Sequence, residues 1–184
     1  MKLYNQLFKK KSVLENWHVP FIVNLASILK PKNYLELGIY QAELFNKLIP
    51  HCGRLTGIDI YSDSKNFIKK SNKTNFICST TDNFFENLNQ TKIKYDLIFI
   101  DADHSYESVK KDFNNSLEVI ANHGIILLHD SYPLNKEFTD PGYCGDGYKA
   151  VFELSKKTKN YEMVTIPVHP GLTIARKRTK QVNF

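Results

Sequence analysis

Lys94-Tyr95-Asp96-Leu97-Ile98-Phe99-Ile100-Asp101-Ala102-Asp103-His104-Ser105-Tyr106 is the stretch of sequence that decides the fold. Its apolar run is typical of a strand that is buried on both faces of a parallel sheet. Two carboxylates and an imidazole follow at the carboxyl end of that strand, where open parallel sheets place their ligand crevice. Beyond Ser105, apolar residues recur at helical spacing and predict an amphipathic helix: Val109, Phe113, Leu117 and Ile120.

The hinge between this strand and this helix holds three polar residues, Asp101, Asp103 and His104. In the simplest alternative, Asp103 or Ser105 caps the helix and Asp101 merely ends the strand. A cap needs only one such residue, and this hinge has three. We therefore interpret it as a functional site.

The rest of the chain alternates helix and strand signals. Strands are predicted at 34–38, 55–60, 75–78, 95–100 and 124–128, with helical patterns before and between them. Later, a helix over 148–154 precedes two β-rich runs, 161–166 and 172–176, whose connecting turn is short enough for an antiparallel hairpin. This pattern predicts a doubly wound, Rossmann-like α/β fold: a seven-stranded sheet, mostly parallel, with an antiparallel C-terminal hairpin.

One domain is expected over residues 1–184, since this length supplies one sizeable core. Residues 1–19 are weakly patterned and form an N-terminal extension in this interpretation. Residues 131–147 contain two prolines, three glycines and no periodic segment, and loops of this length are usually functional. We expect a lid over the active site whose aromatic side chains either reach the substrate or pack under their own loop: Tyr132, Phe138, Tyr143 and Tyr148.

Composition narrows the classes of partner. The net charge is +6, but only Arg54, Arg176 and Arg178 among the 25 basic residues are arginines. Sparse arginine and scattered lysines argue against a nucleic-acid partner, and we interpret the excess positive charge as a solvated surface. The sequence shows no apolar run long enough for a membrane span and no signal peptide. Its few, widely spaced cysteines indicate a reducing cytoplasm.

The turn after the first predicted strand, residues 36–42, bears on the cofactor. A dinucleotide site needs three glycines in a G-x-G-x-x-G pattern, but this turn has only Gly38. Glu36 would also repel a pyrophosphate. S-adenosylmethionine fits better because Glu36 can meet its cationic methionine end, directly or through water. Asp59, at the end of the second strand, can accept hydrogen bonds from both ribose hydroxyls. Alternatively, Gly38 forms a plain tight turn and Asp59 is a solvent-exposed strand end.

Four segments together resemble class I S-adenosylmethionine-dependent methyltransferases: residues 34–38, 57–59, 95–106 and 124–130. The resemblance covers about residues 30–176. It points to the branch of metal-dependent O-methyltransferases that act on sugars and other small molecules. It implies that Glu36 and Gly38 hold the methionine end, that Asp59 holds the ribose, and that Ser79 and Thr80 lie near the adenine. The chain departs from the family by having Tyr40 and Ala42 where another glycine is usual.

The acidic hinge suggests how a hydroxyl could be activated. Asp101 and Asp130 end strands that should be neighbours, and two carboxylates suit Mg²⁺ or Mn²⁺. His129 is a weaker candidate for the same metal, because adjacent strand residues point to opposite faces. His104, three residues after Asp101, is the candidate general base. Asp101 is thus expected to contact the cofactor, to bind the metal and to take part in catalysis. In the alternative, no metal binds and Asp130 holds a loop amide.

Three functions are consistent with these patterns. An S-adenosylmethionine-dependent methyltransferase acting on the hydroxyl of a small molecule or sugar agrees best with Glu36, Asp59 and the acidic hinge. An NAD-dependent oxidoreductase on a similar sheet is disfavoured by Glu36 and the missing glycines. A nucleic-acid-modifying methyltransferase or a binding module is disfavoured by the sparse arginines.

Overall fold

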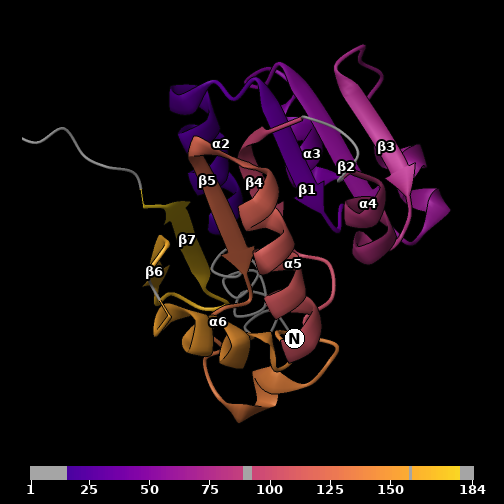
Figure 1. Ribbon diagram of the computed structural model, residues 1–184. Helices are drawn as coiled ribbons and strands as arrows, with labels where there is room; N and C mark the ends of the chain where they lie inside the picture. The colour runs from indigo at the N-terminus through magenta and orange to yellow at the C-terminus, as the bar shows by residue number, and fades with distance from the viewer. Residues whose placement is uncertain (1–15, 89–92, 158, 179–184) are drawn as a thin grey trace, which may run out of the picture.

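The computed structural model describes residues 16–88, 93–157 and 159–178, and its centre is a seven-stranded sheet (Figure 1). The strands are β1 (Asn33–Leu37), β2 (Arg54–Asp59), β3 (Thr74–Cys78), β4 (Tyr95–Ile100), β5 (Ile120–His129), β6 (Tyr161–Ile166) and β7 (Leu172–Lys177). The helices are α2 (His18–Leu29), α3 (Glu43–Leu48), α4 (Thr81–Leu88), α5 (Tyr106–Val119) and α6 (Gly147–Ser155), with the 3-10 helices η1 (Ser62–Phe67) and η2 (Lys136–Thr139).

The strand order is β3-β2-β1-β4-β5-β7-β6. The strands from β3 to β5 are parallel, and β7 runs antiparallel to both β5 and β6. The prediction that β1 and β4 are adjacent central strands is confirmed, as is the antiparallel hairpin at one edge. The predicted fold class is therefore confirmed.

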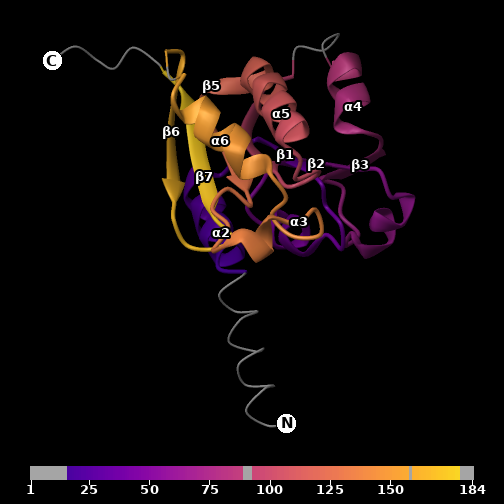
Figure 2. The ribbon, with the colours of Figure 1, turned by 90° about the horizontal axis from the view of Figure 1, so that it is seen from below.

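Helices cover both faces of the sheet (Figure 2). Successive strand residues point to opposite faces, so β1 sends Leu35 and Leu37 into one core and Tyr34 into the other. The first core lies under α4, α5 and α6, and the second lies under α2 and α3. The central strand β4 is buried along nearly its whole length because both faces of the sheet are covered there, and most of its residues are apolar as the sequence predicted.

Some predicted boundaries were wrong. The helical pattern after Ser105 includes Ile120, but α5 ends at Val119 and Ile120 begins β5 opposite Tyr95. Ile120 is buried as the first residue of β5, and an apolar residue would equally suit the buried face of a helix, so its character could not tell helix from strand. The predicted N-terminal extension, 1–19, overlaps the start of α2 at His18, and residues 1–15 lie outside the described part. Among the described helices, none has the length and apolarity needed to cross a membrane.

Candidate active site

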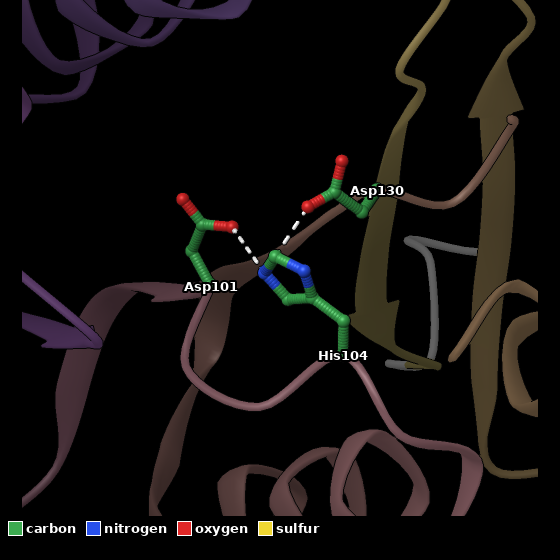
Figure 3. A group of neighbouring side chains, drawn as sticks. All are labelled: Asp101, His104 and Asp130. Atoms are coloured by element: carbon green, nitrogen blue, oxygen red, sulfur yellow. Dashed lines mark ion pairs between the residues drawn. The ribbon is translucent and has the colours of Figure 1, made fainter. Parts of the chain in front are cut away.

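Four side chains meet where β4 and β5 end, and we call them the acidic corner: Asp101, His104, His129 and Asp130. Asp101 directly follows β4, and Asp130 directly follows β5. The two strands pair in parallel register up to Ile100 and Leu128, so their carboxyl ends lie side by side. Ligand atoms of Asp101, His104 and Asp130 all lie within 4.8 Å of one another. Figure 3 shows the two carboxylates turned toward the His104 imidazole.

His104 lies between the two carboxylates. Its Nε2 is 3.1 Å from Asp130 Oδ2 and 3.5 Å from Asp101 Oδ1. Its Nδ1 contacts the carbonyl oxygen of Tyr143. Burial alone would lower the pKa of His104, but the hydrogen bond to Asp101 and the charges of both aspartates outweigh it and raise the pKa to about 9. In this arrangement the imidazole carries its proton at neutral pH.

His129 faces the same two carboxylates from the end of β5. Its Nδ1 is 3.0 Å from Asp101 Oδ1 and 3.3 Å from Asp130 Oδ2. Despite burial, the charge of Asp101 and the hydrogen bonds to both carboxylates raise the pKa of His129 to about 10. In return, the two imidazoles hold the pKa of Asp101 below its usual range, although burial opposes this.

The backbone at Asp130 explains how two successive residues reach one site. Asp130 has φ +52°, so the chain leaves strand geometry immediately after His129. The alternation that would send the two side chains to opposite faces therefore stops at this point. The left-handed region is strained for a residue other than glycine, and such residues concentrate at functional sites.

His18, at the start of α2, is a neighbour of this site that the sequence analysis missed. Its Nδ1 is 3.0 Å from His129 Nε2, and its side chain is buried. It also stacks on Phe99 of β4, with 6.1 Å between the ring centroids. No motif surrounds His18, and the contact joins residues 111 positions apart, so no local pattern in the sequence could predict it.

An open cleft of about 1310 Å³ runs from the acidic corner along the carboxyl ends of β1 to β5. It brings together eight of the nine residues that the sequence predicted for the site: Gly38, Asp59, Ser79, Thr80, Asp101, His104, His129 and Asp130. The ninth, Glu36, is not among the lining residues.

Glu36 is buried on β1, two residues before Gly38. Its side chain is only 3% exposed and accepts a hydrogen bond of 2.6 Å from the hydroxyl of Tyr34. Burial outweighs this hydrogen bond and raises the pKa of Glu36 to about 8. The carboxyl group is therefore mostly protonated at neutral pH, whereas the sequence predicted a charged carboxylate at the cationic methionine end of the cofactor.

Asp59 organises the turn that follows β1. Its Oδ2 accepts hydrogen bonds from the backbone N–H groups of Ile39 (3.1 Å) and Tyr40 (2.8 Å), and its Oδ1 accepts one from Tyr61 (2.9 Å). Tyr40 and Ala42 have φ +44° and +55°, so the turn has the left-handed backbone that glycine would favour. The carboxylate of Asp59 thus helps to hold a strained turn in place.

Gly38 allows the turns after β1 and β4 to approach closely. A Cβ at this position would lie 2.3 Å from the carbonyl oxygen of Asp101, and φ is +82°. The turn after β1 therefore passes directly beside the acidic corner, and any larger residue at Gly38 would force the two turns apart.

The loop 131–147 reaches the site through its backbone. The carbonyl oxygen of Tyr143 holds His104, and Pro141 and Gly142 line the cleft. The ring of Phe138 packs on Tyr143, with 5.7 Å between centroids, while the rings of Tyr132 and Tyr143 are about half exposed. Cys144 lines a small cavity beside all four residues of the acidic corner.

The chain is similar to proteins of known class. Residues 35–131, more than half of the chain, match the model of a methyltransferase domain. An Arabidopsis thaliana protein named for caffeoyl-CoA O-methyltransferase activity is 27% identical over 191 residues, covering 95% of this chain and 81% of its own length.

Solved structures have the same fold. An O-methyltransferase from Bacillus cereus, in complex with S-adenosylhomocysteine, superposes with a TM-score of 0.74 at 15% identity. An O-methyltransferase of tomaymycin synthesis from Streptomyces achromogenes, in complex with S-adenosylmethionine, gives the same values. Each comparison covers 88% of this chain and 80% of the other. At this identity the likeness extends to the fold alone.

Proposed function

The chain belongs to the family of methyltransferase domains, and on that premise we propose that it transfers a methyl group from S-adenosylmethionine to a hydroxyl of a small molecule. One observation carries the proposal: the turns predicted to hold the cofactor and the acidic corner line a single cleft. A donor bound along the carboxyl ends of β1 to β3 would therefore lie beside groups that can bind and activate a hydroxyl.

The charge of the cleft suits this donor. Six acidic residues line it, and its two lysines, Lys110 and Lys111, form ion pairs with Glu153 and Asp82. A negative wall favours a ligand with a sulfonium and an ammonium group and disfavours a pyrophosphate. The close approach at Gly38 and the carboxylate of Asp59 fit the methionine and ribose parts of such a ligand. Ser79 and Thr80 lie farther along the same cleft and fit the adenine end.

The acidic corner fits a divalent metal ion. Asp101 and Asp130 supply two carboxylates, and His129 faces both of them. When bound, the ion would lower the pKa of the acceptor hydroxyl and orient it. The protein side chains and main chain position the two reactants. Asp101 and Asp130 position the acceptor, and the closely packed turn at Gly38 keeps the methyl donor beside it.

The role of His104 depends on whether Asp101 and Asp130 also bind another cation. With both aspartates directed at it, its imidazole is protonated and cannot accept a proton from a hydroxyl. A neutral His104 requires that another cation share the aspartates, and it could then act as the predicted general base. The loop 131–147 covers this side of the corner, and we propose that it is the active-site lid that selects the acceptor.

Two measurements test the proposal. Thermal-shift assays should show that S-adenosylhomocysteine raises the melting temperature and that NAD does not. Isotope-labelled S-adenosylmethionine should then pass its methyl group to oxygen in at least one member of a panel of catechols, sugars and other hydroxylated compounds. Stabilisation by NAD alone, or label found only on an oligonucleotide, would overturn the proposal.

A further inference from the structure

Three residues of the acidic corner, Asp101, His104 and Asp130, offer ligand atoms that all lie within 4.8 Å of one another, and His129 adds a nitrogen that faces both carboxylates. His104 Nε2 and His129 Nδ1 each face the same two oxygens, Asp101 Oδ1 and Asp130 Oδ2, and the four N···O distances are 3.0, 3.1, 3.3 and 3.5 Å. Donors bound at about 2.1 Å, with angles of about 90–110° at the metal, lie about 3.0–3.4 Å apart. The observed spacing thus matches neighbouring positions in a coordination sphere.

The remote nitrogen of each imidazole is held by the protein. His104 Nδ1 contacts the carbonyl oxygen of Tyr143, so in the neutral ring Nδ1 carries the proton and Nε2 can bind a metal. His129 Nε2 is 3.0 Å from Nδ1 of the buried His18. Metal-ligating histidines almost always have such a partner on their second nitrogen, because it sets the ring orientation and strengthens the ligand. These contacts of the remote nitrogens are independent of the N···O spacing, and they also support His104 and His129 as metal ligands.

We propose that the acidic corner is a mixed nitrogen and oxygen metal site in which His104 and His129 are ligands beside Asp101 and Asp130, and that it selects Zn²⁺ or Co²⁺ over Mg²⁺. The inference rests on the proposed function only in placing a metal at this corner. The two carboxylates balance the two positive charges of the ion. Mg²⁺ keeps oxygen ligands and several waters, whereas imidazole suits the later transition metals. His104 is then a ligand and not the general base.

Direct metal binding tests the assignment without an activity assay. Protein stripped with chelator is titrated with Co²⁺, whose visible spectrum reports nitrogen ligation, and then with Zn²⁺, Mn²⁺ and Mg²⁺ in competition. We expect affinity in the order Zn²⁺ and Co²⁺ above Mn²⁺ above Mg²⁺, with at least about a 100-fold gap between Zn²⁺ and Mg²⁺. His104→Ala and His129→Ala should each weaken Zn²⁺ binding by at least about tenfold and change the Co²⁺ spectrum.

The chain offers a matched control. His123 forms another imidazole–aspartate pair, with Asp96 at 2.8 Å, and its side chain is 78% exposed near the start of β5. His123→Ala should leave the titration unchanged. His104→Asp should narrow the gap between Zn²⁺ and Mg²⁺, because it replaces a nitrogen ligand by oxygen. Circular dichroism of each variant in chelator shows whether it is folded before any metal is added.

Unchanged Zn²⁺ affinity and an unchanged Co²⁺ spectrum in both histidine variants would overturn the inference, as would Mg²⁺ binding as tight as Zn²⁺. S-adenosylhomocysteine binding, measured separately by thermal shift in chelator, tests the proposed function. Ligand stabilisation without selective metal binding would refute only the inference. Selective metal binding without ligand stabilisation would refute only the methyltransferase proposal.

Discussion

His18 Nδ1 and His129 Nε2 lie 3.0 Å apart and join the first turn of α2 to the end of β5. Their ring centroids are separated by 3.9 Å, and both rings contact Phe99. Since His129 Nδ1 faces both aspartates, His18 can fix the direction in which His129 presents that nitrogen. We infer that His18 is a positioning residue for the acidic corner.

We therefore expect His18→Phe to weaken Zn²⁺ binding by about 10–100-fold, the usual effect of losing a partner of a metal-bound histidine. Phenylalanine keeps the stacking on Phe99 but cannot hydrogen-bond to His129. His18→Asn should recover part of the affinity. Affinity for S-adenosylhomocysteine should stay unchanged, because His18 is not among the residues lining the cleft. Calorimetric titration with each ligand measures both effects, and equal losses in the two titrations would indicate general misfolding instead.

Asp59→Ala should have two separable effects. The first is a loss of about 1–3 kcal/mol in binding S-adenosylhomocysteine, if the carboxylate also accepts from the ribose. The second is a lower melting temperature without ligand, because three backbone N–H groups lose their acceptor and the strained turn at Tyr40 loses support. Calorimetry well below the melting temperature isolates the first effect. Asp63→Ala, at an exposed position on η1, serves as the control.

Asp112 of α5 should make stability depend on pH. It is 1% exposed, neither carboxylate oxygen has a hydrogen bond of normal geometry among the described residues, and the nearby Thr81 side chain offsets only part of the effect of burial. Burial raises its pKa from 3.8 to about 7. Between these values the folded protein keeps a proton that the unfolded chain releases, so the free energy of unfolding falls as pH rises.

Replacing Asp112 by Asn removes this titration. Urea unfolding between pH 4 and pH 8 should show that the wild type loses about 1–4 kcal/mol more than Asp112→Asn over this range. Asp63→Asn, at an exposed position on η1, is the control. Parallel stability curves for wild type and Asp112→Asn would show that Asp112 is ionised in the folded protein.

The strand ends could be predicted from the sequence, whereas several side-chain environments could not. The alternation of strands and helices places Asp101 and Asp130 at neighbouring carboxyl ends because parallel strands share one edge. The contact between Tyr34 and Glu36 follows from their i, i+2 spacing on one strand face, but the depth of their burial depends on α2 and α3. The turn of the backbone at Asp130 and the approach of His18 arise from tertiary packing, which leaves no local pattern.

The acidic corner itself gives the last prediction. Asp101→Asn and Asp130→Asn should abolish methyl transfer and leave S-adenosylhomocysteine affinity within about tenfold, because the lost interactions act on the acceptor and the transition state.

His104→Ala should lower turnover by about 10²–10⁴ if His104 is a positioned base, and the same variant should also lower turnover if His104 is a metal ligand. Excess metal separates the two roles. If His104 is a ligand, raising the metal concentration until the weakened site fills should restore the turnover of His104→Ala. If His104 is the base, the turnover defect of His104→Ala should persist at metal saturation. Full activity of His104→Ala in the presence of chelator would exclude both roles, and His104 would then serve only to anchor the loop at Tyr143.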